Sequence, residues 1–177
     1  TGLTNILIFF LQESLNWTTK ASSGTLVVVG IIAIIVQGGL IGPLVKKFGE
    51  MRLTLIGSGF ILVACSLLIT APKENATINI YSAVSFLAIG AGLITPTLRA
   101  LISKKLDVNK QGSILSNLQG LQSLGGVLGI AMAGRVYDSF GPKSPFIAGS
   151  IILIFMIYLI AEGKNNKSLY DQKTNLL

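Results

Sequence analysis

Four neutral polar side chains lie close together within an otherwise apolar stretch of the sequence. They are Asn117, Gln119, Gln122 and Ser123. A polar group taken out of water is costly unless it finds a hydrogen-bond partner, so these side chains should face other protein groups or a water-filled cavity. Two interpretations stay open. The side chains either join neighbouring helices by hydrogen bonds, or they form the polar wall of a cavity that binds a small molecule.

A cationic side chain, Arg99, lies near the end of the preceding apolar stretch, which reads GAGLITPTLRALIS over residues 90–103. Pro96 predicts a kink there, and the hydroxyl group of Thr95 or Thr97 can bind the carbonyl group that the proline leaves without a donor. Arg99 either extends along apolar surface to reach water or contacts an anion or a gating group in a cavity.

Small residues recur at a spacing of four in the stretch that holds the amides. This spacing places them along one face of a helix, where they allow two helices to approach closely. Gly90 and Gly92 offer the same possibility in the preceding stretch. The two series in the amide-bearing stretch are Gly112, Ser116, Gly120 and Gly125, Gly129, Ala133.

A short basic segment, GPLVKKFGEMR over residues 42–52, predicts a tight link between two helices, with Pro43 marking the end of the first. Its basic side chains either only fix the orientation of the helices or also contact helix ends and neighbouring loops. The residues of this motif are Gly42, Lys46, Lys47, Gly49 and Arg52.

The residue inventory excludes several kinds of enzyme. The sequence has no histidine and a single cysteine, Cys65, which we interpret as a small packing residue. Ser58 therefore lacks a histidine base, no cysteine and histidine cluster can hold zinc, and no pair of acids lies within an apolar stretch. We expect neither an enzyme nor a bound cofactor or metal.

The elements that carry these residues are long apolar runs. Each complete run approaches the roughly 20 residues that a helix needs to cross the hydrocarbon core of a bilayer. The mean hydropathy is +0.72 and only 12% of residues are charged, so the sequence predicts a polytopic helical membrane protein. The complete runs are 23–42, 53–71, 78–102, 112–136 and 145–162, and a shorter run, 3–12, opens the chain.

The positive charges are sorted by the loops between these runs. If successive runs cross the membrane in alternating directions, ten Lys and Arg residues fall on one side and four on the other. In membrane proteins the cytoplasmic loops carry the excess of Lys and Arg. The side with more Lys and Arg is therefore predicted to be cytoplasmic, together with a tail at 163–177, and the membrane to be a plasma or inner membrane. Since this sorting accounts for the net charge of +7, the charge gives no support to nucleic-acid binding. The richer side holds Lys46, Lys47, Arg52, Arg99, Lys104, Lys105, Lys110, Lys164, Lys167 and Lys173, against Lys20, Lys73, Arg135 and Lys143.

These segments together resemble the C-terminal half of a major facilitator superfamily transporter, over essentially the whole chain. GPLVKKFGEMR resembles the second copy of the short-loop motif of this family, although Lys46 stands where the family has an acidic residue. The order of GAGLITPTLRALIS, a Gln-Gly pair and a glycine-rich stretch ending in AGRVYD resembles helices ten and eleven of drug:proton antiporters, including the tetracycline-exporter branch.

The resemblance implies an all-α fold, the C-terminal six-helix half of a twelve-helix major facilitator fold with its first helix truncated. Residues 3–12 would end helix seven, and helices seven, eight, ten and eleven would line a central cavity. We therefore expect substrate-cavity residues on these helices. They are Asn5, Gln12, Gln37, Thr95, Arg99, Asn117, Gln119 and Gln122.

The function that the resemblance implies is secondary active transport of a small molecule by alternating access. The expected form is a proton-coupled exporter of drugs or metabolites, with the lipid bilayer and an N-terminal six-helix half outside this sequence as partners. Two alternatives stay open. One is an importer of sugars or other metabolites with the same fold, and the other is a non-transporting assembly subunit or degenerate half-transporter.

Overall fold

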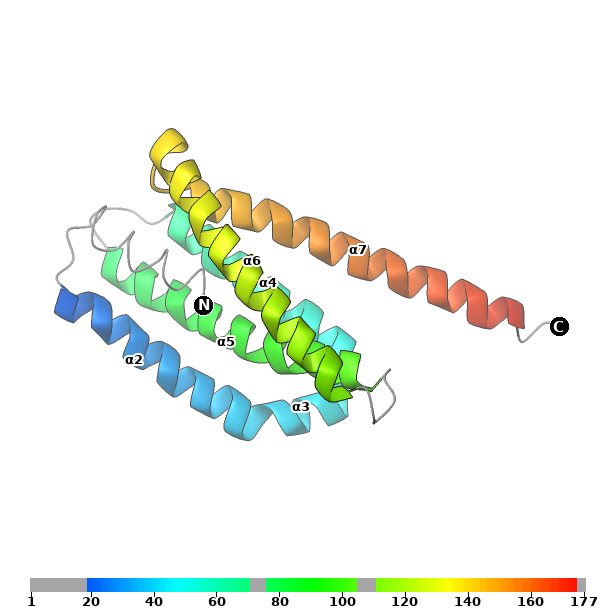
Figure 1. The fold of residues 1–177 in the computed structure, drawn as a ribbon. Coiled ribbons are helices and arrows are strands. Elements are labelled where there is room, and N and C mark those ends of the chain that lie inside the picture. The colour runs from blue at the N-terminus through cyan, green and yellow to red at the C-terminus, as the bar shows by residue number, and fades with distance from the viewer. Residues whose placement is uncertain (1–18, 71–75, 105–110, 175–177) are drawn as a thin grey trace.

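The described part of the chain consists of long helices (Figure 1). The computed structural model describes residues 19–70, 76–104 and 111–174, so the expected run 3–12, with Asn5 and Gln12, lies outside the described residues. The elements are α2 (Thr19–Ile35), the π-helix η1 (Val36–Leu40), α3 (Ile41–Phe48), α4 (Glu50–Thr70), α5 (Ala76–Ser103), α6 (Gln111–Phe140) and α7 (Ser144–Thr174).

The first described helix continues past the proline that was expected to end it. Pro43 lies inside α3, and α2, η1 and α3 follow one another without an intervening loop. Proline lacks an N–H donor, and its ring crowds the carbonyl group four residues earlier. The wider π turn comes directly before it, with the Ile41 N–H bonded to the Val36 carbonyl oxygen. We infer that this turn accommodates the proline ring, so the predicted boundary at Gly42-Pro43 was wrong.

The true end of this helix is Gly49, the one residue between α3 and α4. Its φ of 75° is a left-handed conformation that glycine adopts without steric cost, and its N–H donates to the Val45 carbonyl oxygen at 2.9 Å. Lys46 and Lys47 occupy the last turn of α3, where positive charge is favourable. The tight link predicted from the basic segment is confirmed.

The core follows the line along which α4 packs on α5, the most extensive helix contact in the described chain. The two backbones meet at a pair of glycines. A Cβ atom added to Gly90 would lie 2.6 Å from the Gly57 carbonyl oxygen, and one added to Gly57 would lie 3.0 Å from the Gly90 carbonyl oxygen. The close approach predicted from Gly90 is therefore confirmed, and Gly92 lies in the same way against the side chain of Val36.

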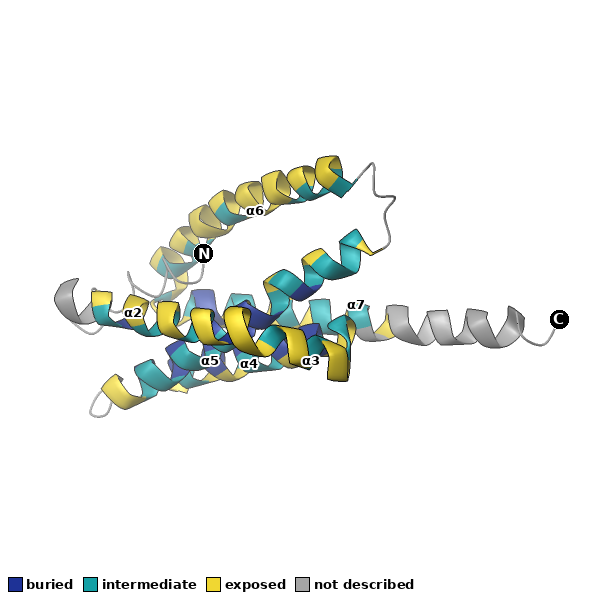
Figure 2. Cartoon of the chain, turned by 90° about the horizontal axis from the view of Figure 1, so that it is seen from below, coloured by how far each residue is buried: buried dark blue, intermediate teal, exposed yellow. Residues whose placement is uncertain are grey.

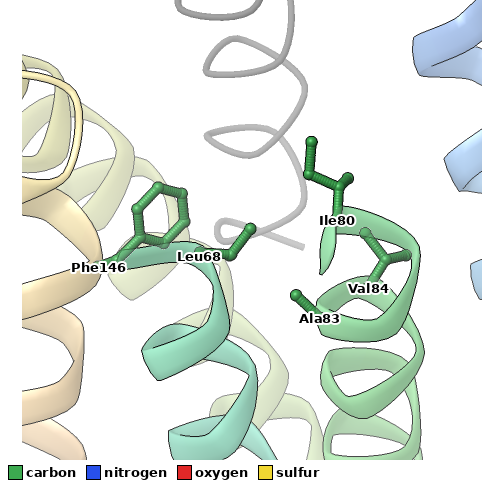
Figure 3. Close-up of a cluster of buried hydrophobic side chains, with 5 residues drawn as sticks. All are labelled: Leu68, Ile80, Ala83, Val84 and Phe146. Carbon is green, nitrogen blue, oxygen red and sulfur yellow. The ribbon is translucent and has the colours of Figure 1, made fainter. Parts of the chain in front are cut away.

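Apolar clusters cover this contact from end to end. Leu68, Ile80 and Phe146 meet where α4 ends and where α5 and α7 begin (Figure 3). Cys65 is buried farther along with Ile61 and Leu87, as its expected packing role requires. Since one cluster collects the end of α4 and the starts of α5 and α7, these helices alternate in direction, as successive membrane spans do.

Large apolar side chains cover the outside of the bundle. Ile34 is 73% exposed, Leu121 69% and Ile152 68%. Exposed large apolar side chains on several helices suit a surrounding of lipid or protein. Among the described residues, three helices are long and apolar enough to cross a membrane: Ser23–Phe48, Glu50–Thr70 and Thr77–Ser103.

The remaining two helices differ from these three. α6 is long but has glycines and amides among its apolar residues, none of its residues is buried, and Figure 2 shows it mostly exposed. Ser144–Ile160 is a shorter apolar helix. Its backbone continues as α7 to Thr174, where the sequence predicted a tail from residue 163. Lys, Gln and Glu have good helix propensity, and no proline interrupts residues 163–174. The helix therefore continues beyond the end of the apolar run.

Candidate functional site

The guanidinium group of Arg99 lies between two amide side chains of α6. Its Nη2 atom donates to Gln119 Oε1 at 2.5 Å and lies 3.5 Å from Gln122 Oε1. Arg99 thus reaches from α5 to the next helix through the residues that sequence analysis selected. Both acceptors are neutral, so they orient the guanidinium group without cancelling its charge.

A pocket of about 580 Å³ opens between α5 and α6 around these groups. α5 contributes Thr95 and Arg99, one helical turn apart on the same face. α6 contributes residues with the spacing of a single helical face. These are Gln119, Gln122, Ser123, Gly126, Val127 and Ile130.

A second pocket, of about 310 Å³, continues past Arg99 toward the end of α5. It is lined by Arg99, Ala100, Ser103, Leu115 and Gln119. Arg99 and Gln119 belong to both pockets, and no acidic side chain is among the described residues that line them. Arg99 is therefore the charged residue that the described linings of the two pockets share, and its side chain is exposed.

The structure brings together four of the eight expected cavity residues: Thr95, Arg99, Gln119 and Gln122. Asn117 does not line this pocket. It precedes Gln119 by two residues on α6, so its side chain leaves the helix about 160° away, and it is exposed. Gln37 is exposed in η1 beside α5, near Gly92.

The small-residue series on α6 behave differently from the expectation. A Cβ atom added at Gly112, Gly120, Gly125 or Gly129 would find no atom within 4 Å in the described chain. Within this chain the predicted tight packing is therefore wrong at these four positions. The second series instead lines an apolar pocket of about 380 Å³ between α6 and α7.

The basic segment lies at the end of the bundle where α5 ends. Gly42, Lys46, Lys47 and Arg52 are exposed. The neighbouring Glu50 forms an ion pair with Lys104, directly after α5. This contact joins the α3–α4 turn to the end of α5, which places both segments on the same side of the bundle, as the alternation of charge predicts.

Sequence analysis missed one buried polar contact. The hydroxyl oxygens of Thr54 on α4 and Thr97 on α5 lie 3.0 Å apart, and both residues are buried. The Thr97 hydroxyl also donates to the Leu93 carbonyl oxygen at 2.7 Å. Thr97 thus joins two helices beside Pro96. Two threonines 43 residues apart carry no local signal of pairing.

Among the described residues, no group of three or more His, Cys, Asp or Glu side chains could hold a metal ion. The site therefore offers hydrogen bonds, one cationic group and apolar wall for binding a ligand. Long lipid-compatible helices around a polar pocket define a polytopic helical membrane protein.

Comparison with protein families gives the particular class. The family model of the Major Facilitator Superfamily matches residues 1–130. The chain belongs to this transporter family, as the resemblance of its loops and helices implied.

Several characterised proteins are similar to this chain. Tetracycline resistance protein, class H, of Pasteurella multocida is 29% identical over 133 residues, which cover 75% of this chain and 32% of that protein. Multidrug resistance protein 2 of Bacillus subtilis is 23% identical over 163 residues, covering 92% of this chain and 40% of that protein. The probable folate-biopterin transporter 7 of Arabidopsis thaliana is 26% identical over 138 residues, covering 74% and 31%.

The chain thus spans between 32% and 40% of the length of the two resistance proteins. No solved structure matches it.

Proposed function

We propose that this chain is the substrate-binding half of a secondary transporter that exports a small molecule by alternating access. The observation that carries the proposal is the pocket of about 580 Å³ between α5 and α6, which collects Thr95, Arg99, Gln119 and Gln122. Polar groups within membrane-spanning helices are costly and typically mark a substrate path. Similarity to tetracycline and multidrug resistance proteins supports export as the direction.

Alternating access requires a second helical unit against which this bundle can rock. The exposed face of α6, on which no residue is buried, is a suitable surface for such a unit. We propose that the unit is the N-terminal six-helix half of the same fold, and that a proton gradient drives transport. The membrane is proposed to be the plasma or inner membrane, with the α3–α4 turn on the cytoplasmic side.

The test is an efflux assay with the protein at its natural full length in inside-out vesicles. Tetracycline, a lipophilic cation and a lipophilic carboxylate are offered in turn, and uptake into the vesicles is followed after acidification of the lumen. We expect uptake of at least one compound that stops when a protonophore is added. Uptake that persists with the protonophore contradicts proton coupling.

The two alternatives give different results in the same assay. An importer of metabolites accumulates sugars or related compounds in right-side-out vesicles and not in inside-out ones. A non-transporting subunit moves none of the compounds in either orientation, although the protein is inserted and folded.

A further inference from the structure

The α5–α6 pocket contains one formal charge. Among the described residues that line it, Arg99 is the only ionisable one, and the other seven are Thr, Gln, Ser, Gly and aliphatic side chains. In the described chain, the carboxylate that forms an ion pair is that of Glu50, and its partner is Lys104. Arg99 therefore faces the pocket without a carboxylate counter-charge from the described residues.

The contacts of Arg99 hold this charge in place but leave it uncompensated. Gln119 Oε1 and Gln122 Oε1 both approach Nη2. A guanidinium group has five N–H donors arranged as a planar fork, so the fork retains donors beyond those directed at the amides. A guanidinium cation and an anion attract each other, and the fork matches the two oxygens of a carboxylate.

The pocket changes from polar to apolar along α6. Gln119, Gln122 and Ser123 surround the guanidinium end, and Val127 and Ile130 form the far end. Residues 119 and 130 are separated by a rise of about 16 Å along the helix. Gly126, which lies between the two ends, adds no side chain to the pocket wall.

We propose, taking this pocket as the transport site of the function proposed above, that its ligand is an amphiphile with an anionic head. Arg99 binds a carboxylate or similar oxyanion, which Gln119 and Gln122 help to orient through their amide N–H groups. The apolar body of the ligand lies along Val127 and Ile130. The site thereby discriminates against cationic amphiphiles of the same shape.

The experiment measures binding separately from transport. The full-length protein is placed in nanodiscs of neutral phosphatidylcholine, and titration calorimetry compares biphenylacetate, biphenylacetamide and biphenylethylamine, which share one apolar body and differ in charge. Empty nanodiscs supply the background. A charge-assisted hydrogen bond corresponds to a preference of about tenfold or more, so we expect the carboxylate to bind at least that much more tightly than the amide or the amine.

Arg99→Gln should remove this preference, and Arg99→Lys should restore part of it. The matched control is Lys143→Gln, which removes the same charge from an exposed position after α6 and should leave the preference unchanged. A second variant retains Arg99. Gln119→Glu places a carboxylate where the 2.5 Å acceptor now lies, and this internal ion pair should lower carboxylate affinity as much as Arg99→Gln does.

The outcomes separate the two proposals. Equal binding of the three compounds, preference for the amine, absence of binding by all three, or a preference that survives Arg99→Gln overturns the anionic ligand class but not the proposed transport. Arg99-dependent binding of the carboxylate without export of any compound supports the ligand class and overturns the exporter.

Discussion

At the scale of single residues, the proposed site rests on the polar groups that lie within the apolar runs. Sequence analysis selected Arg99, Gln119 and Gln122 because each is costly in lipid, and the structure brings all three to one pocket. It did not separate Asn117 from them. Hydropathy detects that a residue is polar, whereas which face of the helix borders the pocket depends on the neighbour against which the helix packs.

Gln119→Leu tests the pocket directly. The change removes the shortest acceptor of the Arg99 guanidinium, so the guanidinium group loses the contact that orients it in the pocket. We expect the transport rate in vesicles to fall by about tenfold or more with unchanged protein level.

Asn117→Leu is the companion variant, and transport is again the measurement. Sequence analysis predicts that Asn117→Leu also impairs transport. An effect at Asn117 equal to that at Gln119 would show that the functional cavity extends beyond the α5–α6 pocket, and an effect at Asn117 alone would contradict the pocket assignment.

Thr97→Val tests the polar contact that sequence analysis missed. The Thr54 and Thr97 hydroxyl oxygens, 3.0 Å apart and buried, would lose their contact, and a polar contact between helices in a membrane contributes about 1 kcal/mol. The measurement is the free energy of unfolding in an SDS titration. Thr70→Val is the control, since its exposed hydroxyl donates only to the Ser66 carbonyl oxygen of its own helix. Equal destabilisation by both variants would argue against a contribution from the Thr54–Thr97 contact.

At the scale of elements, helix positions were predictable and helix ends were less so. The observed α4, α5 and α6 begin and end within about four residues of the predicted runs. The ends of α3 and α7 were missed. The length of an apolar run predicts where the chain leaves the lipid. A helix ends elsewhere, where a residue such as Gly49, with its positive φ, takes the backbone out of the helical conformation. Pro43 indicated a boundary, but the adjacent η1 allows the helix to pass through it.

Gly90→Ala tests the contact between α4 and α5. The added methyl group would lie 2.6 Å from the Gly57 carbonyl oxygen, so the two backbones must separate, and overpacking of this kind costs about 1–3 kcal/mol. Thermal unfolding of the purified protein is the measurement. The control is Gly59→Ala, on α4 but with no atom within 4 Å of the added position. A Gly90→Ala protein as stable as its Gly59→Ala counterpart would contradict the close packing.

At the scale of the whole molecule, the sequence predicted the alternation of helices, and the contacts at both ends of the bundle agree with it. Leu68, Ile80 and Phe146 meet at one end, and Glu50 and Lys104 pair at the other. Which end faces the cytoplasm follows from the distribution of positive charge alone, so it stays a prediction. No local pattern could place α6, which shares few contacts with α5.

Cysteine labelling tests this orientation. Cys65, the one cysteine in this sequence, is buried, so it should not compete with a new cysteine for the label. In right-side-out vesicles, a membrane-impermeant maleimide should label Lys143→Cys and should label Lys46→Cys only after permeabilisation. Gel-shift detection of the label is the measurement. The reverse pattern would contradict the assigned orientation.

The π turn at Val36–Leu40 has a consequence for comparing this chain with its relatives. A π turn bonds each N–H to the carbonyl group five residues earlier, one more than an α turn, so η1 holds one residue beyond the regular count. Removing one residue there would restore the α-helical ladder while keeping the helix directions. The homologous helix of a relative without this turn should therefore align with a one-residue gap within 36–40, and with both flanking segments in register.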